Sequence, residues 1–161
     1  MFSIQEILDL AIRLEQNGES VYRNASEKLS RSDLVSLLLW MAEEEVKHAG
    51  WFSELKQKLE SGSINPFMEE MGREIFTDML GEKSFSHRDL DFSKIDQVHD
   101  LIAIFIEFEQ DTVLFYETLK PFIEDNDTLN YLNKIIAEEN NHIAELHNFL
   151  ANEAEVIVNG D

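Results

Sequence analysis

The sequence predicts an all-α protein, a four-helix bundle with one long crossover between the second and third helices. Three observations indicate this fold class. The 161 residues include only two prolines and six glycines, too few turn signals for an all-β protein. Along four segments, apolar residues recur at alternating spacings of three and four, as they do on one face of a helix. Residues 62–93 are too long for a tight turn and suit a connection along the bundle.

The first two predicted helices form an antiparallel hairpin. Ser3 and Glu6 make a capping box, in which each residue bonds the free backbone N–H of the other, and the first apolar stripe then runs to Leu29. Ser30 begins a second capping pair, and the stripe that follows it ends at Gly62. The connection between the two stripes is short, so the helices must turn back on each other.

The third and fourth predicted helices form a second hairpin. Ser93 and Asp96 are the capping pair of the third helix, which stops before Pro121 because proline disfavours helix in the preceding residue. Asp127 is the predicted cap of the fourth helix. The tail after Leu150 is short and has little helical patterning.

These elements predict a single domain over residues 1–161, with helical hairpins at about 4–61 and 94–152 and the crossover at 62–93. Apolar residues make up 43% of the chain, enough for one domain with a sizeable core.

The composition excludes several classes of function. The chain has 33 acidic and 13 basic residues and a formal charge of −20, which excludes nucleic acid and anionic membranes as partners because both are polyanions. Without cysteine it can hold no disulfide, thiolate zinc site or iron–sulfur cluster. No basic apolar leader and no stretch of 18 apolar residues occur, so we expect a soluble, cytoplasmic protein.

A glutamate interrupts each of the four apolar stripes at mid-helix, and two of these glutamates are followed three residues later by a histidine. Residues three apart on a helix lie on neighbouring parts of one face, so both side chains can reach one point in the core. These six candidate metal ligands are Glu15, Glu45, His48, Glu109, Glu139 and His142.

The six positions also form an internal repeat, in which Glu15 corresponds to Glu109 and the Glu-x-x-His of the second helix to that of the fourth. Within each half, the midpoint between the two glutamates falls at a predicted turn, at Ser30 and Glu124. Folding each half therefore sets its two glutamates opposite each other. Packing the halves together brings four carboxylates and two imidazoles to one level of the core.

Four carboxylates in one buried layer need compensation, because an uncompensated buried charge costs several kcal/mol or shifts its pKa until it is neutral. Two divalent cations balance four negative charges. Carboxylates with imidazoles suit iron or manganese, and this ligand set is that of ferritin-like di-iron and di-manganese proteins. We therefore expect two iron ions as cofactors, with manganese as the alternative.

Segments 11–22 and 42–49, which carry Glu15 and the motif Glu45-Val46-Lys47-His48, resemble the rubrerythrin family. The resemblance covers the four helices and implies a ferritin-like fold. It also implies a role for each ligand: Glu15 and Glu109 as terminal carboxylates, Glu45 and Glu139 as bridging carboxylates, and His48 and His142 as terminal nitrogen ligands.

The same resemblance implies a non-haem di-iron oxidoreductase that reduces hydrogen peroxide or dioxygen. Rubrerythrins carry a Cys₄ rubredoxin domain that feeds electrons to the site, and this chain has no cysteine, so a separate electron-donor protein is expected. The family also has an extra glutamate where this chain has Thr112, which leaves a plain six-ligand set, closer to bacterioferritin or a simple ferritin-like oxidase.

Two alternatives stay open: an iron-binding ferroxidase for iron storage or trafficking, and a bundle that binds no metal and serves as an interaction module.

Tyr22 and Tyr116 are further candidates for the site, as catalytic residues outside the ligand set. They lie two turns beyond Glu15 and Glu109 on the same helix faces. Each could donate a hydrogen bond to a ligand or take part in redox chemistry, and the alternative is a packing role with a satisfied hydroxyl.

Residues 34–41 and 101–108 are apolar nearly all round their helices. Each has one face for the core and a second face that needs cover, from the crossover or from another subunit. We expect a homodimer.

Overall fold

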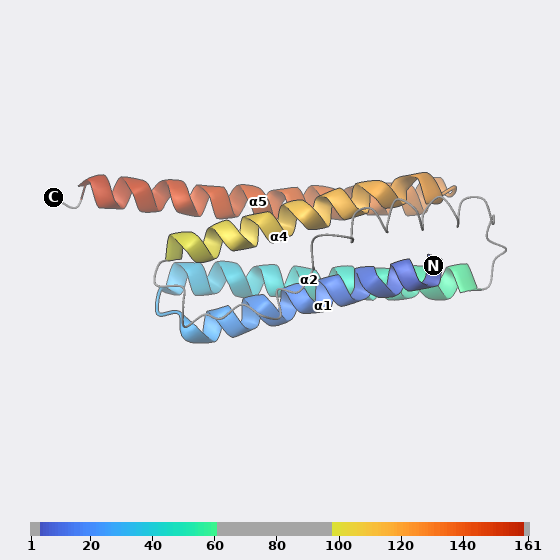
Figure 1. The fold of residues 1–161 in the computed structure, drawn as a ribbon, viewed down its shortest axis with the longest axis horizontal. Coiled ribbons are helices and arrows are strands. Elements are labelled where there is room, and N and C mark those ends of the chain that lie inside the picture. The colour runs from blue at the N-terminus through green and yellow to red at the C-terminus, as the bar shows by residue number, and fades with distance from the viewer. Residues whose placement is uncertain (1–3, 61–97, 160–161) are drawn as a thin grey trace. The chain divides into compact units, whose positions relative to one another are not determined.

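The computed structural model describes residues 4–60 and 98–159. These residues fold into two compact units, one containing α1 and α2 and the other α4, η3 and α5 (Figure 1). No strand occurs among them. The helices are α1 (Ile4–Lys28), α2 (Ser32–Glu60), α4 (Val98–Leu119), the short 3₁₀ helix η3 (Lys120–Phe122) and α5 (Asn126–Asn159).

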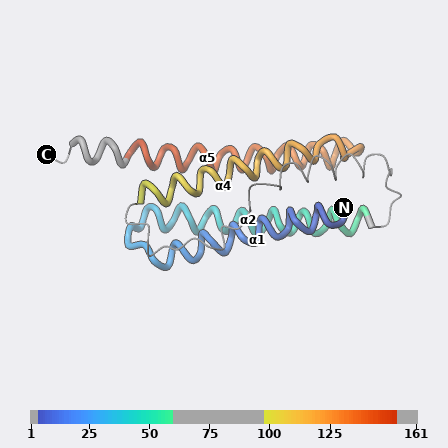
Figure 2. The backbone as a smooth tube through the Cα atoms, in the orientation of Figure 1, coloured from blue at the N-terminus to red at the C-terminus, as the bar shows by residue number. Residues whose placement is uncertain are grey.

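In the first unit, α1 and α2 run antiparallel and lie side by side, joined by a short turn (Figure 2). The turn contains Ser30, as predicted, but α2 begins at Ser32. The N–H of Val35 donates to the carbonyl of Arg31 at 2.9 Å, so Arg31 rather than Ser30 precedes the first turn. Asp33 pairs with Arg31 at 2.7 Å and accepts from the N–H of Leu34 at 3.0 Å. The predicted cap at Ser30 is therefore wrong by one residue.

In the second unit, α4 ends at Leu119 and Pro121 lies in η3, which confirms the predicted stop. The cap of α5 is Asp125, not Asp127. The carboxylate of Asp125 accepts from the N–H of Thr128 at 2.9 Å and from its hydroxyl at 2.6 Å. This pairing satisfies one of the free N–H groups at the start of the helix, as an N-cap does.

The fourth predicted helix is longer than its amphipathic pattern indicates. It was expected to end near residue 152, and α5 continues to Asn159. The added stretch, residues 153–159, contains neither glycine nor proline, so nothing in it stops the helix, although Val156, Ile157 and Val158 are β-branched and favour helix less than alanine does.

The predicted cap at Ser93 and Asp96 and the crossover at 62–93 lie outside the described residues. Within the described part of the chain, no helix combines the length and apolar character needed to cross a membrane.

The buried residues follow the predicted stripes. On α1 the buried set recurs at spacings of three and four and contains one acid, Glu15, among the apolar side chains. On α4 it contains Glu109 in the same way. The apolar stripes therefore position four acids inside the hairpins, because a residue that continues the stripe takes the same inward direction as its neighbours.

Candidate metal centre

All six predicted ligands are buried. Their exposed fraction is 2% or less in every case, although carboxylates and imidazoles rarely occur fully buried without a partner. The sequence placed each of them on an inward face, and the structure agrees for Glu15, Glu45, His48, Glu109, Glu139 and His142.

In the first unit, three side chains from two helices meet. Glu15 comes from α1, and Glu45 and His48 come from adjacent turns of α2. His48 Nδ1 lies 3.5 Å from Glu15 Oε2. One potential ligand atom from each of the three residues lies within 4.8 Å of the others. We refer to these residues as the first cluster.

In the second unit, the equivalent residues meet in the same way. Glu109 comes from α4, and Glu139 and His142 come from α5. His142 Nδ1 lies 3.1 Å from Glu139 Oε2 and 3.6 Å from Glu109 Oε1. Their potential ligand atoms also lie within 4.8 Å of one another. This second cluster repeats the first, as the internal repeat predicts.

The second cluster holds protons that its residues would lose in water. Burial and the nearby charge of Glu139 together raise the pKa of Glu109 to about 8, against the opposing effect of His142. Burial acts to lower the pKa of His142, but Glu109 and Glu139 outweigh burial and raise it to about 10. Positive charge is therefore favoured between the two carboxylates, supplied by protons when no metal is bound.

Each cluster fits a divalent transition-metal ion. Metal bonds to nitrogen and carboxylate oxygen are about 2.0–2.2 Å long, so ligand atoms on opposite sides of an ion lie about 4.4 Å apart or less. In each cluster the potential ligand atoms lie within 4.8 Å of one another, which is close to that limit. Two carboxylates with one imidazole are ligands that suit iron and manganese. A cation would replace the protons that each cluster needs for charge balance.

Tyr22 and Tyr116 are fully buried, each on the helix face that carries a ligand glutamate. Burial is expected both for a group that acts on the ligands and for a packing residue, so their roles stay predictions. Thr112 is also buried, and its hydroxyl donates to the carbonyl of Phe108 at 3.0 Å. Thr112 therefore directs its hydroxyl proton to the backbone.

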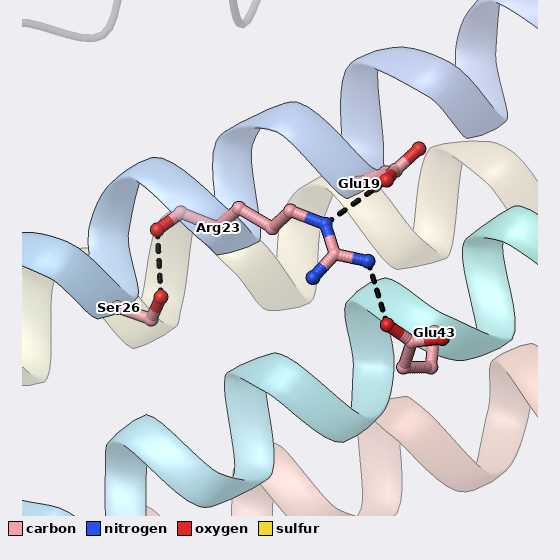
Figure 3. Close-up of polar contacts among 4 residues, drawn as sticks. All are labelled: Glu19, Arg23, Ser26 and Glu43. Atoms are coloured by element: carbon pink, nitrogen blue, oxygen red, sulfur yellow. Dashed lines mark hydrogen bonds and ion pairs between the residues drawn. The ribbon is translucent and has the colours of Figure 1, made fainter.

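An ion-pair network on the outside of the first hairpin was not predicted. Arg23 on α1 pairs with Glu19 at 2.9 Å and with Glu43 on α2 at 2.7 Å (Figure 3). The Ser26 hydroxyl donates to the Arg23 carbonyl at 2.6 Å. The spacing of Glu19 and Arg23 is a signal in the sequence for a pair within one helix. No such signal exists for Glu43, which approaches Arg23 only because the hairpin closes.

Among the described residues, the two remaining histidines, His99 and His147, are exposed and lie outside both clusters. His87 lies outside the described residues.

Comparison with known proteins agrees with the fold and the ligand pattern. Residues 6–150 match the model of the rubrerythrin family. The chain is similar to a solved structure from Thermotoga maritima described as a ferritin-like diiron-carboxylate protein. The two share 24% sequence identity, and the match covers 91% of this chain and 93% of the other, with a TM-score of 0.67. No curated protein matches the sequence. The structural similarity confirms the predicted ferritin-like four-helix-bundle fold.

Proposed function

The chain belongs to the rubrerythrin family, and we propose that its two clusters together bind two iron ions, with manganese as the alternative. We further propose that the protein is an oxidoreductase that reduces hydrogen peroxide or dioxygen with electrons from a separate donor protein. The observation that carries the proposal is the pair of matching buried clusters, each with two carboxylates and one imidazole at metal-binding separations.

Charge balance supports two ions rather than one. The clusters contain four carboxylates, and two divalent cations neutralise four negative charges. A single divalent ion would leave two buried carboxylates to be neutralised by protons. Such protons are bound only while the pH stays below the raised pKa of a group such as Glu109.

The family resemblance suggests a ligand role for each of the six residues. Glu15 and Glu109 would each hold one ion as terminal carboxylates, and Glu45 and Glu139 would be the bridging carboxylates. His48 and His142 would complete the ligand set as neutral imidazoles. The proton that the raised pKa keeps on His142 must therefore leave when metal binds. The apolar residues around each cluster exclude bulk water and strengthen these electrostatic contacts.

When bound, two ferrous ions supply two electrons, which reduce one hydrogen peroxide and two protons to two water molecules. The chain would contribute ligand geometry and proton delivery. We assign to the buried tyrosines on the two helix faces that carry Glu15 and Glu109, Tyr22 and Tyr116, the role of donating a hydrogen bond to a ligand carboxylate or of supplying an electron. A phenylalanine replacement separates this role from packing, since it removes the hydroxyl and keeps the ring.

The deciding experiment is anaerobic loading with ferrous iron, followed by stopped-flow mixing with peroxide or with dioxygen. We expect two iron ions per chain by elemental analysis. Faster oxidation by peroxide than by dioxygen would support the peroxidase activity. A metal content below one ion per chain would contradict the di-metal site and leave the interaction module as the better explanation.

A ferroxidase for iron storage or trafficking is the second candidate, and Thr112 is the observation that favours it. Residue 112 is a threonine, so it provides no additional carboxylate, and its hydroxyl donates to the carbonyl of Phe108. If dioxygen is the better oxidant and size-exclusion chromatography shows a large cage, storage is the function. If the protein elutes as a dimer and prefers peroxide, the oxidoreductase proposal holds.

A further inference from the structure

The outer surface of α2 carries an exposed apolar patch behind the ligand-bearing face. Leu39 and Trp40 are each 40% exposed, and Val46 is 42% exposed. All three are three or four residues from Glu43 along the helix, so they surround its side chain on the helix surface. We refer to Leu39, Trp40 and Val46 as the α2 patch.

Only the width of helix α2 separates the α2 patch from the first cluster. Val46 directly follows Glu45, and the patch spans the same turns that carry Glu45 and His48 on the opposite side. An α-helix with its side chains is about 10–12 Å across. A redox group held against the patch is therefore about one helix diameter from the ligands. Electron transfer slows steeply with distance, so this is a short route to the cluster.

The charges beside the patch favour a basic partner. Glu43 lies at its centre with Glu19 and Glu44 nearby, so three acids accompany two basic residues, Arg23 and Lys47, and the local net charge is −1. Arg23 pairs with Glu19 and Glu43 (Figure 3), and Lys47 pairs with Glu44 at 2.8 Å. The whole chain has a charge of −20, so a second copy would bring like charge to this face. A partner with a basic rim is attracted instead.

We propose that the α2 patch is the docking site of the electron donor, a small redox protein whose apolar contact area is ringed by lysine or arginine. This inference rests on the proposed di-iron function. Three partly exposed apolar side chains suit the small interface of a transient redox encounter, not a permanent one. In each encounter the donor is oxidised by one electron and the metal held by Glu45 and His48 is reduced by one, with no bond formed or broken. Two encounters supply the two electrons that one peroxide requires.

The test uses a small basic c-type cytochrome in its ferric form as the probe. The iron-loaded, reduced protein is mixed anaerobically with the cytochrome, and haem absorbance follows the transfer of one electron to each haem. We expect Trp40→Lys and Val46→Lys each to lower the second-order rate constant at low salt by about fivefold or more, through lost apolar contact and added positive charge. The matched control is Leu114→Lys on α4, where a residue 58% exposed receives the same charge. Its rate should stay within about twofold of wild type, because a change in net charge alone acts weakly.

A binding measurement that needs no turnover completes the test. With the zinc-loaded, ¹⁵N-labelled protein, the cytochrome should shift the backbone amide signals of residues 39–47, and it should not do so in Trp40→Lys. Shifts centred elsewhere, or wild-type electron-transfer rates in both lysine variants, would overturn the docking site. Dissociation of a dimer into monomers by Trp40→Lys in sedimentation would also overturn it, since the patch would then be a subunit interface.

These outcomes are distinct from failure of the proposed function. If the protein binds two irons and peroxide oxidises them, but the lysine variants react with the cytochrome at the wild-type rate, only the docking site is wrong. If it binds no iron, the proposed function itself is wrong.

Discussion

A glutamate in an apolar helix face is costly, and one occurs in each of the four long helices that the structure describes. Glu15, Glu45, Glu109 and Glu139 are all buried, with 1% exposure or less. Neither helix propensity nor surface solvation accounts for an acid at these positions, because Leu or Ala would stabilise the same face. The sequence alone was enough to find these residues, since an acid that continues an apolar stripe is conspicuous without any tertiary information.

Replacing one ligand should remove metal without damaging the fold. We expect Glu139→Ala to lower the iron content from two to one ion or fewer per chain and to abolish the rise in melting temperature on metal binding. The metal-free variant should be at least as stable as metal-free wild type, because the carboxylate that raises the pKa of Glu109 is gone. Elemental analysis and thermal unfolding measure both effects.

Glu145→Ala is the matched control, since Glu145 is exposed on the same helix. It should keep both metal content and the metal-dependent melting temperature. Unchanged metal content in Glu139→Ala would show that the ligand assignment is wrong.

The raised pKa values predict how the stability of the metal-free protein depends on pH. Glu109 (pKa about 8, against an ordinary 4.5) and His142 (about 10, against 6.5) keep protons in the folded state that the unfolded chain has lost. The folded state then binds more protons than the unfolded state, so stability falls as pH rises. The loss runs from about pH 4.5 to 10, with a slope of up to about 1.4 kcal/mol per pH unit for each retained proton.

Urea unfolding of chelator-treated protein at a series of pH values tests this prediction. The metal-loaded protein serves as the comparison, because its ligands are already deprotonated and its stability should vary less above pH 6.5. A metal-free stability that is flat or rises between pH 6 and 9 would contradict the proton-holding cluster.

At the scale of the helical element, the caps show where sequence patterns stop being sufficient. Asp125 and Asp127 are both reasonable N-caps, and only the direction in which the chain leaves η3 decides between them. Asp125 is the one that reaches the N–H and hydroxyl of Thr128. The end of α5 is decided differently. Its apolar stripe stops, but the residues that follow include neither glycine nor proline, so no helix-breaking residue ends α5 before Asn159.

The cap assignment has a direct test. Asp125→Ala should lower the free energy of unfolding by about 1 kcal/mol, the usual cost of losing an N-cap side chain. Asp127→Ala removes the same group two residues later, in the first turn of α5, and should cost a few tenths of a kcal/mol at most through the helix dipole. Urea unfolding curves of the two variants beside wild type compare them. An equal loss for both would mean that Asp125 does not act as the cap.

At the scale of the whole molecule, metal binding and folding should be coupled. If the metal binds only the folded chain, free metal at 100 times the dissociation constant stabilises the fold by about 2.7 kcal/mol for each occupied site. For a chain of this length, each occupied site corresponds to a rise in melting temperature of roughly 5–10 °C. Calorimetry with and without ferrous or manganous ion under argon measures the shift.

Magnesium is the matched control ion, because it prefers all-oxygen octahedral sites and should bind poorly to ligands that include two imidazoles. A melting temperature that magnesium raises as much as iron would point to general screening of the charge of −20 instead of a specific site.

The expected homodimer also belongs to this scale. It stays a prediction; Leu39 and Trp40 in the apolar run at 34–41 are each 40% exposed. Sedimentation at several protein concentrations tests it, and a monomer throughout would remove the need for a second subunit. A dimer that survives Trp40→Lys would be compatible with the docking role of the α2 patch.

The sequence by itself determined the four helices, the two short turns and the six buried ligands. These features depend on spacing along the chain, and helical periodicity converts spacing directly into direction. Tertiary packing alone raised the pKa values of Glu109 and His142, because a pKa depends on desolvation and on distances of a few ångströms between side chains. It also decided the Arg23–Glu43 pair and the exposure of the α2 patch, since both depend on which surfaces the closed hairpin leaves beside each other.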